Sequence, residues 1–136
     1  MTLNTQRPLR SLLCLIGLTF FAYTFVLSGS FKVLDDETSI VRNQDIKSFA
    51  SLPKLFTQSF FGGDAYYRPL VSLSYAVEYH FFGLQPFYYY LTNIFLHAGS
   101  VVVLWIFFRL LLKKEETAFA AALLFALHPI DRKSVV

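Results

Sequence analysis

Long stretches without a charged residue are the feature that most limits how this chain can fold. Residues 11–31 form 21 uncharged positions in a row, and residues 79–108 form 30. A helix rises about 1.5 Å per residue, so roughly 20 apolar residues cross the ~30 Å hydrocarbon core of a bilayer. The first stretch has this length, and the second has it over residues 89–108 once the Gly/Pro-containing segment 83–86 is set aside. Both predict transmembrane helices.

Composition excludes several other classes of protein. The chain is 55% hydrophobic and 15% charged, against about 45–50% and 25% in soluble domains. A disordered chain would be polar and rich in charge, and a disulfide scaffold needs more than the single Cys14. Nucleotide-binding glycine loops, CxxC, HExxH and GxSxG motifs are absent, and no basic patch typical of nucleic-acid binding is present. We therefore predict an α-helical integral membrane protein.

A third uncharged stretch, residues 117–130, has 14 positions and spans only about 21 Å as a helix. It is interpreted as the start of a helix that does not complete its crossing. The predicted organisation follows in chain order: a cytoplasmic N-terminus (1–10), a first transmembrane helix (11–31), an extracytoplasmic loop (32–88), a second transmembrane helix (89–108), a cytoplasmic loop (109–116), the start of a third transmembrane helix (117–130) and a tail (131–136).

Lysine and arginine in short loops predict the orientation in the membrane. Arg7 and Arg10 precede the first span, and Arg109, Lys113 and Lys114 follow the second. Two crossings return a chain to its starting side, so both clusters agree on a cytoplasmic N-terminus. The predicted location is the bacterial inner (plasma) membrane.

The first span has a rival interpretation as a cleaved signal peptide, with Ser28, Gly29 and Ser30 as the small-residue cleavage site. However, its apolar core at 12–27 is longer than the usual ~7–15 residues, and a second span follows. A signal anchor is therefore favoured.

The predicted outer loop is rich in Phe and Tyr and contains two amphipathic patterns. One follows Asp45, an N-cap candidate, and runs to Phe60 with Pro53 inside it, where a helix should start or kink. The other starts at Pro69 and should stop at Gly83; its apolar positions are Leu70, Leu73, Val77 and Phe81. Such helices suit a membrane interface, and they equally suit packing against the rest of a larger fold.

Three adjacent acidic residues, Asp35, Asp36 and Glu37, follow the first span. Neighbouring carboxylates repel each other, which favours protonation of one of them and suits a general base. A carboxylate pair also suits a divalent cation, and the plain alternative is a solvated acidic cap outside the bilayer.

Isolated cationic side chains are further candidates. Arg68 lies among aromatic residues, where its guanidinium suits phosphate recognition or a simple interfacial position. His97 and His128 fall within the second and third spans, and ionisable groups at membrane depth are functional candidates. A lone histidine also commonly joins two helices by a hydrogen bond, and Asn93 lies one turn away from His97 as a partner.

Five motifs occur in an order that resembles a known family. They are DDxxxIxxN (35–43), YRPL (67–70), FGLxPFxY (82–89), LTNIFLH (91–97) and LFALHP (124–129). Together they resemble the N-terminal portion of polytopic membrane protein O-mannosyltransferase-like proteins that carry C-terminal tetratricopeptide repeats, in the GT-C group of glycosyltransferases. The resemblance implies a multi-span helical bundle with an extracytoplasmic loop of amphipathic helices.

The resemblance also implies a reaction and roles for named residues. A sugar, typically mannose, is transferred from a polyprenyl-phosphate donor to a hydroxyl acceptor on protein Ser/Thr or a glycan at the extracytoplasmic face. Asp35 is expected to be the base or acceptor-orienting carboxylate, with Asp36 beside it. Arg68 and His128 are expected to stabilise the lipid phosphate that leaves. No resident cofactor or metal is assigned, although the acidic pair suits a divalent cation.

The last residues depart from the family. After Ile130 the chain reads DRKSVV, with Lys133 where the family has an acidic residue, and these six residues resemble a translated sequencing adapter. We expect residues 131–136 to be non-native and the chain to be a fragment that is inactive alone. Two other functions stay open: a small non-enzymatic membrane accessory or assembly protein, and a transporter fragment using His97 and His128.

Overall fold

The structure is a computed structural model that describes residues 6–31, 36–57 and 67–128. Within these ranges it contains helices and turns and no strand, as an α-helical membrane protein requires. The chain divides into two compact units. One comprises residues up to 28 together with those from 90 on, and the other comprises residues 29–89. The second unit coincides closely with the loop predicted between the first two spans.

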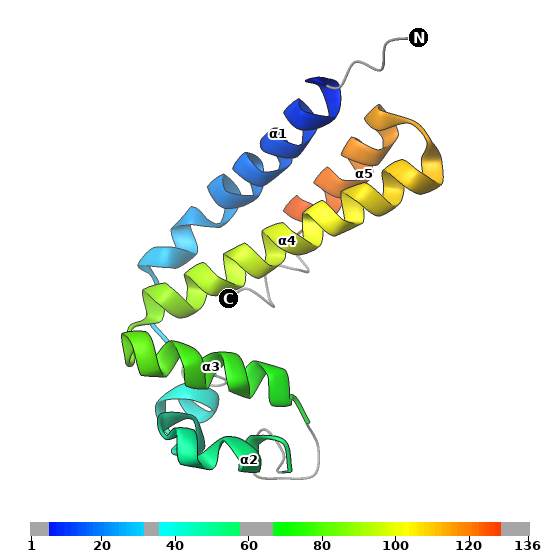
Figure 1. Ribbon diagram of the computed structural model, residues 1–136. Helices are drawn as coiled ribbons and strands as arrows, with labels where there is room; N and C mark the ends of the chain where they lie inside the picture. Colours follow the sequence, from blue (N-terminus) through cyan, green and yellow to red (C-terminus); the bar gives the residue numbers. More distant parts are fainter. Residues whose placement is uncertain (1–5, 32–35, 58–66, 129–136) are drawn as a thin grey trace. The chain divides into compact units, whose positions relative to one another are not determined.

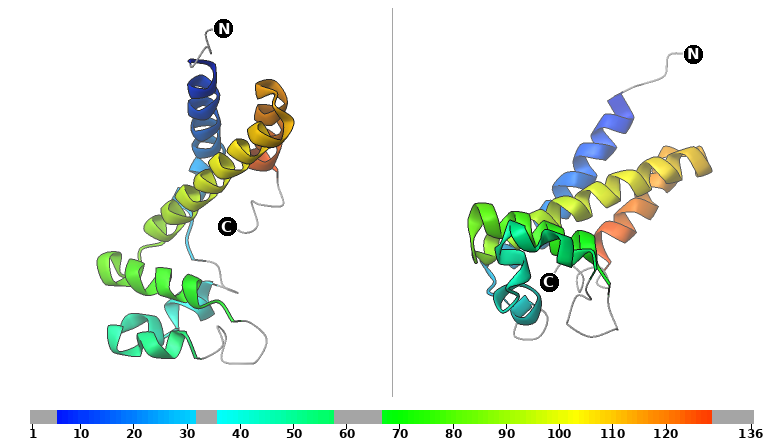
Figure 2. Two further views of the ribbon diagram at one scale, coloured as in Figure 1. Left: turned by 45° about the vertical axis from the view of Figure 1, so that its right-hand side comes forward. Right: turned by 60° about the horizontal axis from the view of Figure 1, so that its bottom comes forward.

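The first unit contains α1 (Gln6–Tyr23), which continues into the 3₁₀ turn η1 (Thr24–Ser28), most of α4 (Pro86–Leu112), and α5 (Glu115–Leu127) (Figure 1). Two segments, Arg7–Ser28 and Pro86–Leu112, are long and apolar enough to cross a membrane. They correspond to the two spans predicted from charge-free stretches. After α4 the chain turns back, and α5 runs antiparallel to it (Figure 2).

Small side chains on α5 form the centre of this unit. Ala118, Ala122 and Ala126 are each 0% exposed, and a spacing of four residues places them on one face of the helix. This face packs against Leu15 of α1 and against Val101 and Trp105 of α4. Alanine lets helix backbones approach closely, which is the usual basis of helix association in membranes.

The boundaries of the later helices differ from the prediction. α4 begins at Pro86 rather than at residue 89, because proline is well tolerated in a first helical turn. The connection to α5 is short: Lys113 has a positive φ of 53°, and its N–H donates to the Arg109 carbonyl at 3.1 Å. This left-handed residue ends α4, and α5 then starts at Glu115 instead of residue 117.

The second unit is built on α3 (Pro69–Phe82), which packs against the short turn η3 (Asp45–Lys47) and the single-turn helix α2 (Leu52–Leu55). Its core contains five buried residues: Ile40, Ile46, Leu55, Ala76 and Tyr89. The Tyr89 hydroxyl donates to the Gly83 carbonyl at 3.0 Å. This bond fastens the start of α4 to the turn that follows α3.

The amphipathic pattern after Asp45 does not form one continuous helix. The chain there forms three short pieces, η3, η4 (Phe49–Ser51) and α2. Ser48 has extended backbone angles of φ −136° and ψ 129° between the first two pieces, and its Oγ accepts the Ala50 N–H at 3.3 Å. A serine that bonds the backbone locally competes with helix formation. Pro53 lies in the first turn of α2, as expected of a helix start, and Phe60 lies outside the described residues.

The predicted bounds of the second loop helix are confirmed. α3 begins at Pro69 and is followed by Gly83, which has a φ of 62°. Its predicted apolar face, however, is not the buried one: Leu70 and Phe81 are 73% and 71% exposed. The buried positions are Ser72, Ala76 and Glu78, because the neighbouring turns pack on that side of the helix.

Candidate functional site

The acidic motif lies at the start of the second unit. Asp35 lies outside the described residues. Asp36 is half-buried and occupies the N-cap position of η2 (Glu37–Val41), with helical angles of φ −68° and ψ −36° and no capping hydrogen bond from its side chain. Its carboxylate is thus not used to cap the turn that follows it.

The segment η2 is a single π-helical turn, closed by the Arg42 N–H donating to the Glu37 carbonyl at 2.8 Å. A π-turn brings residues five apart into register, and such turns are frequent at functional sites. Here the register also joins the two side chains, because Glu37 Oε1 lies 2.9 Å from Arg42 Nε and 2.6 Å from Nη2. Glu37 is therefore held in an ion pair with Arg42.

The other members of the DDxxxIxxN motif position this segment. Ile40 is 2% exposed and belongs to the core of the second unit. The Asn43 Oδ1 accepts the Asp45 N–H at 3.0 Å, which is an Asx turn that starts η3. The motif thus combines a candidate carboxylate with residues that fix its backbone.

Arg68, in the same unit, occupies the N-cap position of α3 with φ −136° and ψ 64°, and it is exposed. Its neighbours in the YRPL motif fix the backbone on either side. The Tyr67 hydroxyl donates to the Phe56 carbonyl at 2.6 Å, and Pro69 opens the helix. Asp36 and Arg68 therefore both stand immediately before a helical turn, at positions set by structural neighbours.

His128 belongs to the first unit. It is exposed at the C-cap of α5, with φ −67° and ψ 130°, and its N–H lies 3.4 Å from the Phe125 carbonyl. His97, by contrast, is 8% exposed, and its Nε2 lies 3.2 Å from the Ala126 carbonyl of α5. The hydrogen bond that joins two helices is thus the role the structure shows for His97, with α5 as the partner instead of Asn93.

In the described ranges there is no group of three or more His, Cys, Asp or Glu side chains that could hold a metal ion. This finding does not cover Asp35. The divalent cation that the acidic pair suits therefore stays a prediction.

Glu78 is a residue that sequence reasoning missed. It lies on α3 and is 6% exposed, although it interrupts a segment of aromatic and apolar residues. In the core of this unit the Tyr89 ring centroid lies 5.9 Å from that of Tyr75, in a tilted arrangement, and 5.3 Å from that of Phe31, edge to face. Glu78 is the one carboxylate in a helix that is otherwise apolar and aromatic apart from two serines and a histidine, and this was the available signal, because a carboxylate is almost never fully buried unless it is paired.

The fold is that of an α-helical membrane protein with a compact helical segment between two apolar helices. The chain is 35% identical over 130 residues to protein O-mannosyl-transferase TMTC1 of Homo sapiens, which covers 89% of this chain. It is 33% identical over 127 residues, 88% of the chain, to TMTC2 of Homo sapiens, and 36% identical over 110 residues, 76% of the chain, to TMTC3 of Mus musculus. The predicted resemblance to O-mannosyltransferase-like proteins is confirmed.

The chain spans only 15%, 15% and 12% of the length of these three relatives. No family model matches the chain. No solved structure matches it.

Proposed function

We propose that this chain contributes the acidic segment of a membrane glycosyltransferase of the GT-C group. The proposed reaction transfers mannose from a polyprenyl-phosphate donor to a Ser/Thr hydroxyl of a protein. The observation that carries the proposal is identity of 30–36% to proteins named O-mannosyl-transferases over 76% or more of the chain. Tetratricopeptide repeats would belong to the parent protein.

The proposed chemistry uses the carboxylates before η2 as base. The acceptor oxygen forms a bond to the anomeric carbon, the carbon–oxygen bond to the phosphate breaks, and the hydroxyl proton passes to Asp35 or Asp36. The leaving phosphate gains negative charge, which a cation such as Arg68 or protonated His128 would stabilise. The assignment to Asp35 and Asp36 rests on the motif, and the third carboxylate, Glu37, is bound to Arg42.

We propose that the N-terminus is cytoplasmic and that residues 32–88 face the opposite side of the membrane. The support is the positive charge of Arg7 and Arg10 at the start of α1, and of Arg109, Lys113 and Lys114 at the end of α4 and just after it. A lipid-linked donor has its phosphate at the bilayer surface, so a segment directly after a membrane span suits it. A bacterial plasma membrane finds no support in the comparisons, because the relatives named above come from human and mouse.

A chimera tests this function. Residues 1–130 of this chain would replace the matching segment of human TMTC1, and mannose transfer from a polyprenyl-phosphate donor to an acceptor peptide would be measured in membranes. Asp35→Asn and Asp36→Asn are each expected to lower transfer at least about 100-fold, since a positioned base contributes roughly 10²–10⁴-fold. Glu37→Gln is the matched control and should retain transfer.

Membrane level and protease protection of each variant would show that insertion is unchanged. Full transfer with both aspartates replaced would remove them from the mechanism. An active, acid-independent chimera would favour the accessory-protein alternative, in which this segment only supports assembly.

A further inference from the structure

The large apolar side chains of α3 are left uncovered by the described residues. Leu70, Val77 and Phe81 are 73%, 41% and 71% exposed. The second and third lie close to two and three helical turns after the first, so all three share one face of the helix. Ser72 and Ala76 are buried on the opposite face. We call Leu70, Val77 and Phe81 the α3 stripe; an exposed apolar surface of this kind marks contact with a partner or a membrane.

Charge around the α3 stripe favours a lipid surface. The helix contains no lysine or arginine, and its one carboxylate, Glu78, is 6% exposed. A surface that docks a protein partner usually has a polar rim around its apolar centre. A helix at a membrane interface needs only apolar area on the side that enters the lipid, which is what the α3 stripe provides.

The end of α3 is fixed to the start of a candidate membrane span. The Phe82 ring, in the last turn of α3, stacks on the Tyr88 ring, in the first turn of α4, with centroids 3.9 Å apart and an interplanar angle of 10°. The Tyr89 hydroxyl donates to the Gly83 carbonyl between them. Phe82 therefore lies at the level of the first turn of α4, which is long and apolar enough to cross a membrane.

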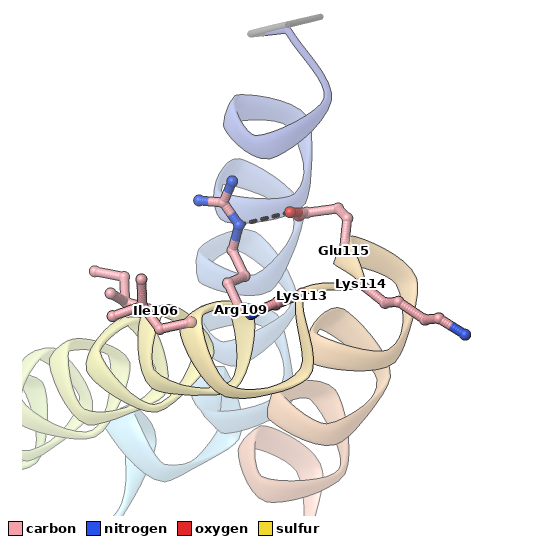
Figure 3. Close-up of a pocket in the computed structure, with 6 residues that line it drawn as sticks. Ile106, Arg109, Lys113, Lys114 and Glu115 are labelled. Carbon is pink, nitrogen blue, oxygen red and sulfur yellow. Dashed lines mark ion pairs between the residues drawn. The ribbon is translucent and has the colours of Figure 1, made fainter.

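The opposite end of α4 indicates where that first turn lies in the bilayer. Arg109 Nε is 2.6 Å from Glu115 Oε2, and Lys113 and Lys114 line the same hollow (Figure 3). A charged cluster of this kind ends a span at the membrane surface. Counting back about 20 residues, or ~30 Å, reaches the start of α4 near Tyr89. The C-terminal end of α3 is thus expected at the other membrane surface.

The buried face of α3 packs against the acidic motif. Ala76 belongs to one core with Ile40 of the motif, and α3 also packs against η3, which follows the motif. Gln44, the N-cap residue of η3, is exposed. A helix with its side chains is about 10–12 Å across. The motif and the α3 stripe are therefore separated by roughly the width of one helix.

We propose that α3 lies in the membrane interface, with the α3 stripe inserted among the lipid chains and the acidic motif held on the opposite side of the helix, at the level of the headgroups. The helix then determines the height of Asp36 above the acyl region. This placement does not depend on the reaction proposed above. It also needs no anionic lipid, because the inserted face carries no cation.

Spin labels measure the depth directly. A nitroxide would be attached to the full chain carrying Cys14→Ser, through Phe81→Cys or Val77→Cys in the α3 stripe and through Gln44→Cys on the other side, in phosphatidylcholine vesicles. Oxygen partitions into lipid and a nickel chelate stays in water, so the two accessibilities give the depth of each label. The stripe labels should lie about 5–10 Å below the headgroups, and the Gln44 label should lie roughly 10 Å closer to water.

A matched pair of added charges tests insertion. Val77→Asp, in the chain labelled at Phe81, should move that label about 3–5 Å toward water, because a carboxylate avoids the acyl region. Gln44→Asp adds the same charge on the other side of α3 and should leave the depth unchanged. Circular dichroism would show retained helix in each variant. Leu70→Cys gives a second label in the α3 stripe should a variant at Phe81 unfold.

Three outcomes would overturn the proposal. Equal access of the nickel chelate to the labels at Phe81 and Gln44 would show that the α3 stripe faces water. Spin–spin broadening at Phe81 that disappears on dilution with unlabelled chain would show that a second copy covers the stripe. A depth that requires phosphatidylserine in the vesicles would assign the membrane contact to cationic side chains elsewhere in the chain.

Discussion

His97 of α4 and Ala126 of α5 are joined by a hydrogen bond, with the His97 Nε2 3.2 Å from the Ala126 carbonyl oxygen. A carbonyl only accepts, so Nε2 must carry the hydrogen. The carbonyls in the last turn of a helix have no partner within that helix, and the imidazole therefore caps the C-terminus of α5. The His97 ring also packs against two other rings: its centroid lies 5.1 Å from the centroid of the Tyr23 ring and 5.5 Å from that of the Phe125 ring.

Replacing His97 by Phe should destabilise the first unit by about 1–2 kcal/mol. The ring contacts would largely persist, but the Ala126 carbonyl would lose its donor at a site where water is scarce. The free energy of unfolding by SDS in mixed micelles, followed by circular dichroism, measures the effect. Leu96→Ala is the control, since Leu96 is 61% exposed and its truncation should change the free energy by less than about 0.5 kcal/mol. Equal effects of the two changes would contradict the capping role.

The sequence was sufficient to predict the features that depend on neighbouring residues. The apolar stretches predicted the spans, and Pro69 and Gly83 predicted the ends of α3, because a fixed φ and a positive φ are local requirements. The His97 contact could not be predicted, because its partner is a backbone carbonyl 29 residues away. Reasoning from helix periodicity pointed to Asn93 instead.

The candidate site was predictable to a smaller extent. The resemblance of motifs predicts roles for Asp35 and Asp36, whereas residue type alone treats Asp35, Asp36 and Glu37 alike. The π-turn that pairs Glu37 with Arg42 has no periodic signature in the sequence. The burial of Glu78 depends on the turns that pack on α3, which the prediction of an amphipathic helix after Asp45 that starts or kinks at Pro53 did not contain.

The Glu37–Arg42 ion pair should contribute little to stability. Its side chains are 32% and 76% exposed, and exposed ion pairs are worth about 0–1 kcal/mol. Glu37→Gln and Arg42→Gln should therefore each lower the free energy of unfolding by less than about 1 kcal/mol, measured by chemical denaturation. The double change should cost about the same as either single change. A loss in the free energy of unfolding well above about 1 kcal/mol would show that the ion pair holds the π-turn together.

Gly83→Ala should destabilise the turn between α3 and α4 by about 1–3 kcal/mol. Gly83 has φ 62° and ψ −145°, a region that is nearly restricted to glycine. Beyond Gly83 and its two chain neighbours, no heavy atom of the described residues lies within 4 Å of the place where a Cβ would be, so the cost arises from the backbone alone. Thermal unfolding followed by circular dichroism measures it.

Gly99→Ala is the matched control for that measurement. Gly99 lies within α4 and also has open space around its Cβ position, but its backbone is helical. Alanine should therefore stabilise the helix there, by up to about 1 kcal/mol. Two glycine-to-alanine changes of opposite sign would identify backbone angle, rather than added volume, as the cause.

Ala122→Leu should separate α5 from its neighbours. Ala122 is 0% exposed and lies in the cluster with Leu15 and Trp105, where three added carbons have no space. Overpacking of this kind costs about 1–3 kcal/mol, and close helix contacts in membranes depend on small residues. Ala120→Leu makes the same change at an exposed position of α5 and should be nearly neutral.

The efficiency of cysteine cross-linking between α1 and α5, in variants lacking Cys14, measures the separation of these helices. It should fall for Ala122→Leu and stay unchanged for Ala120→Leu. Equal cross-linking in both variants would show that the alanine face does not hold these helices together.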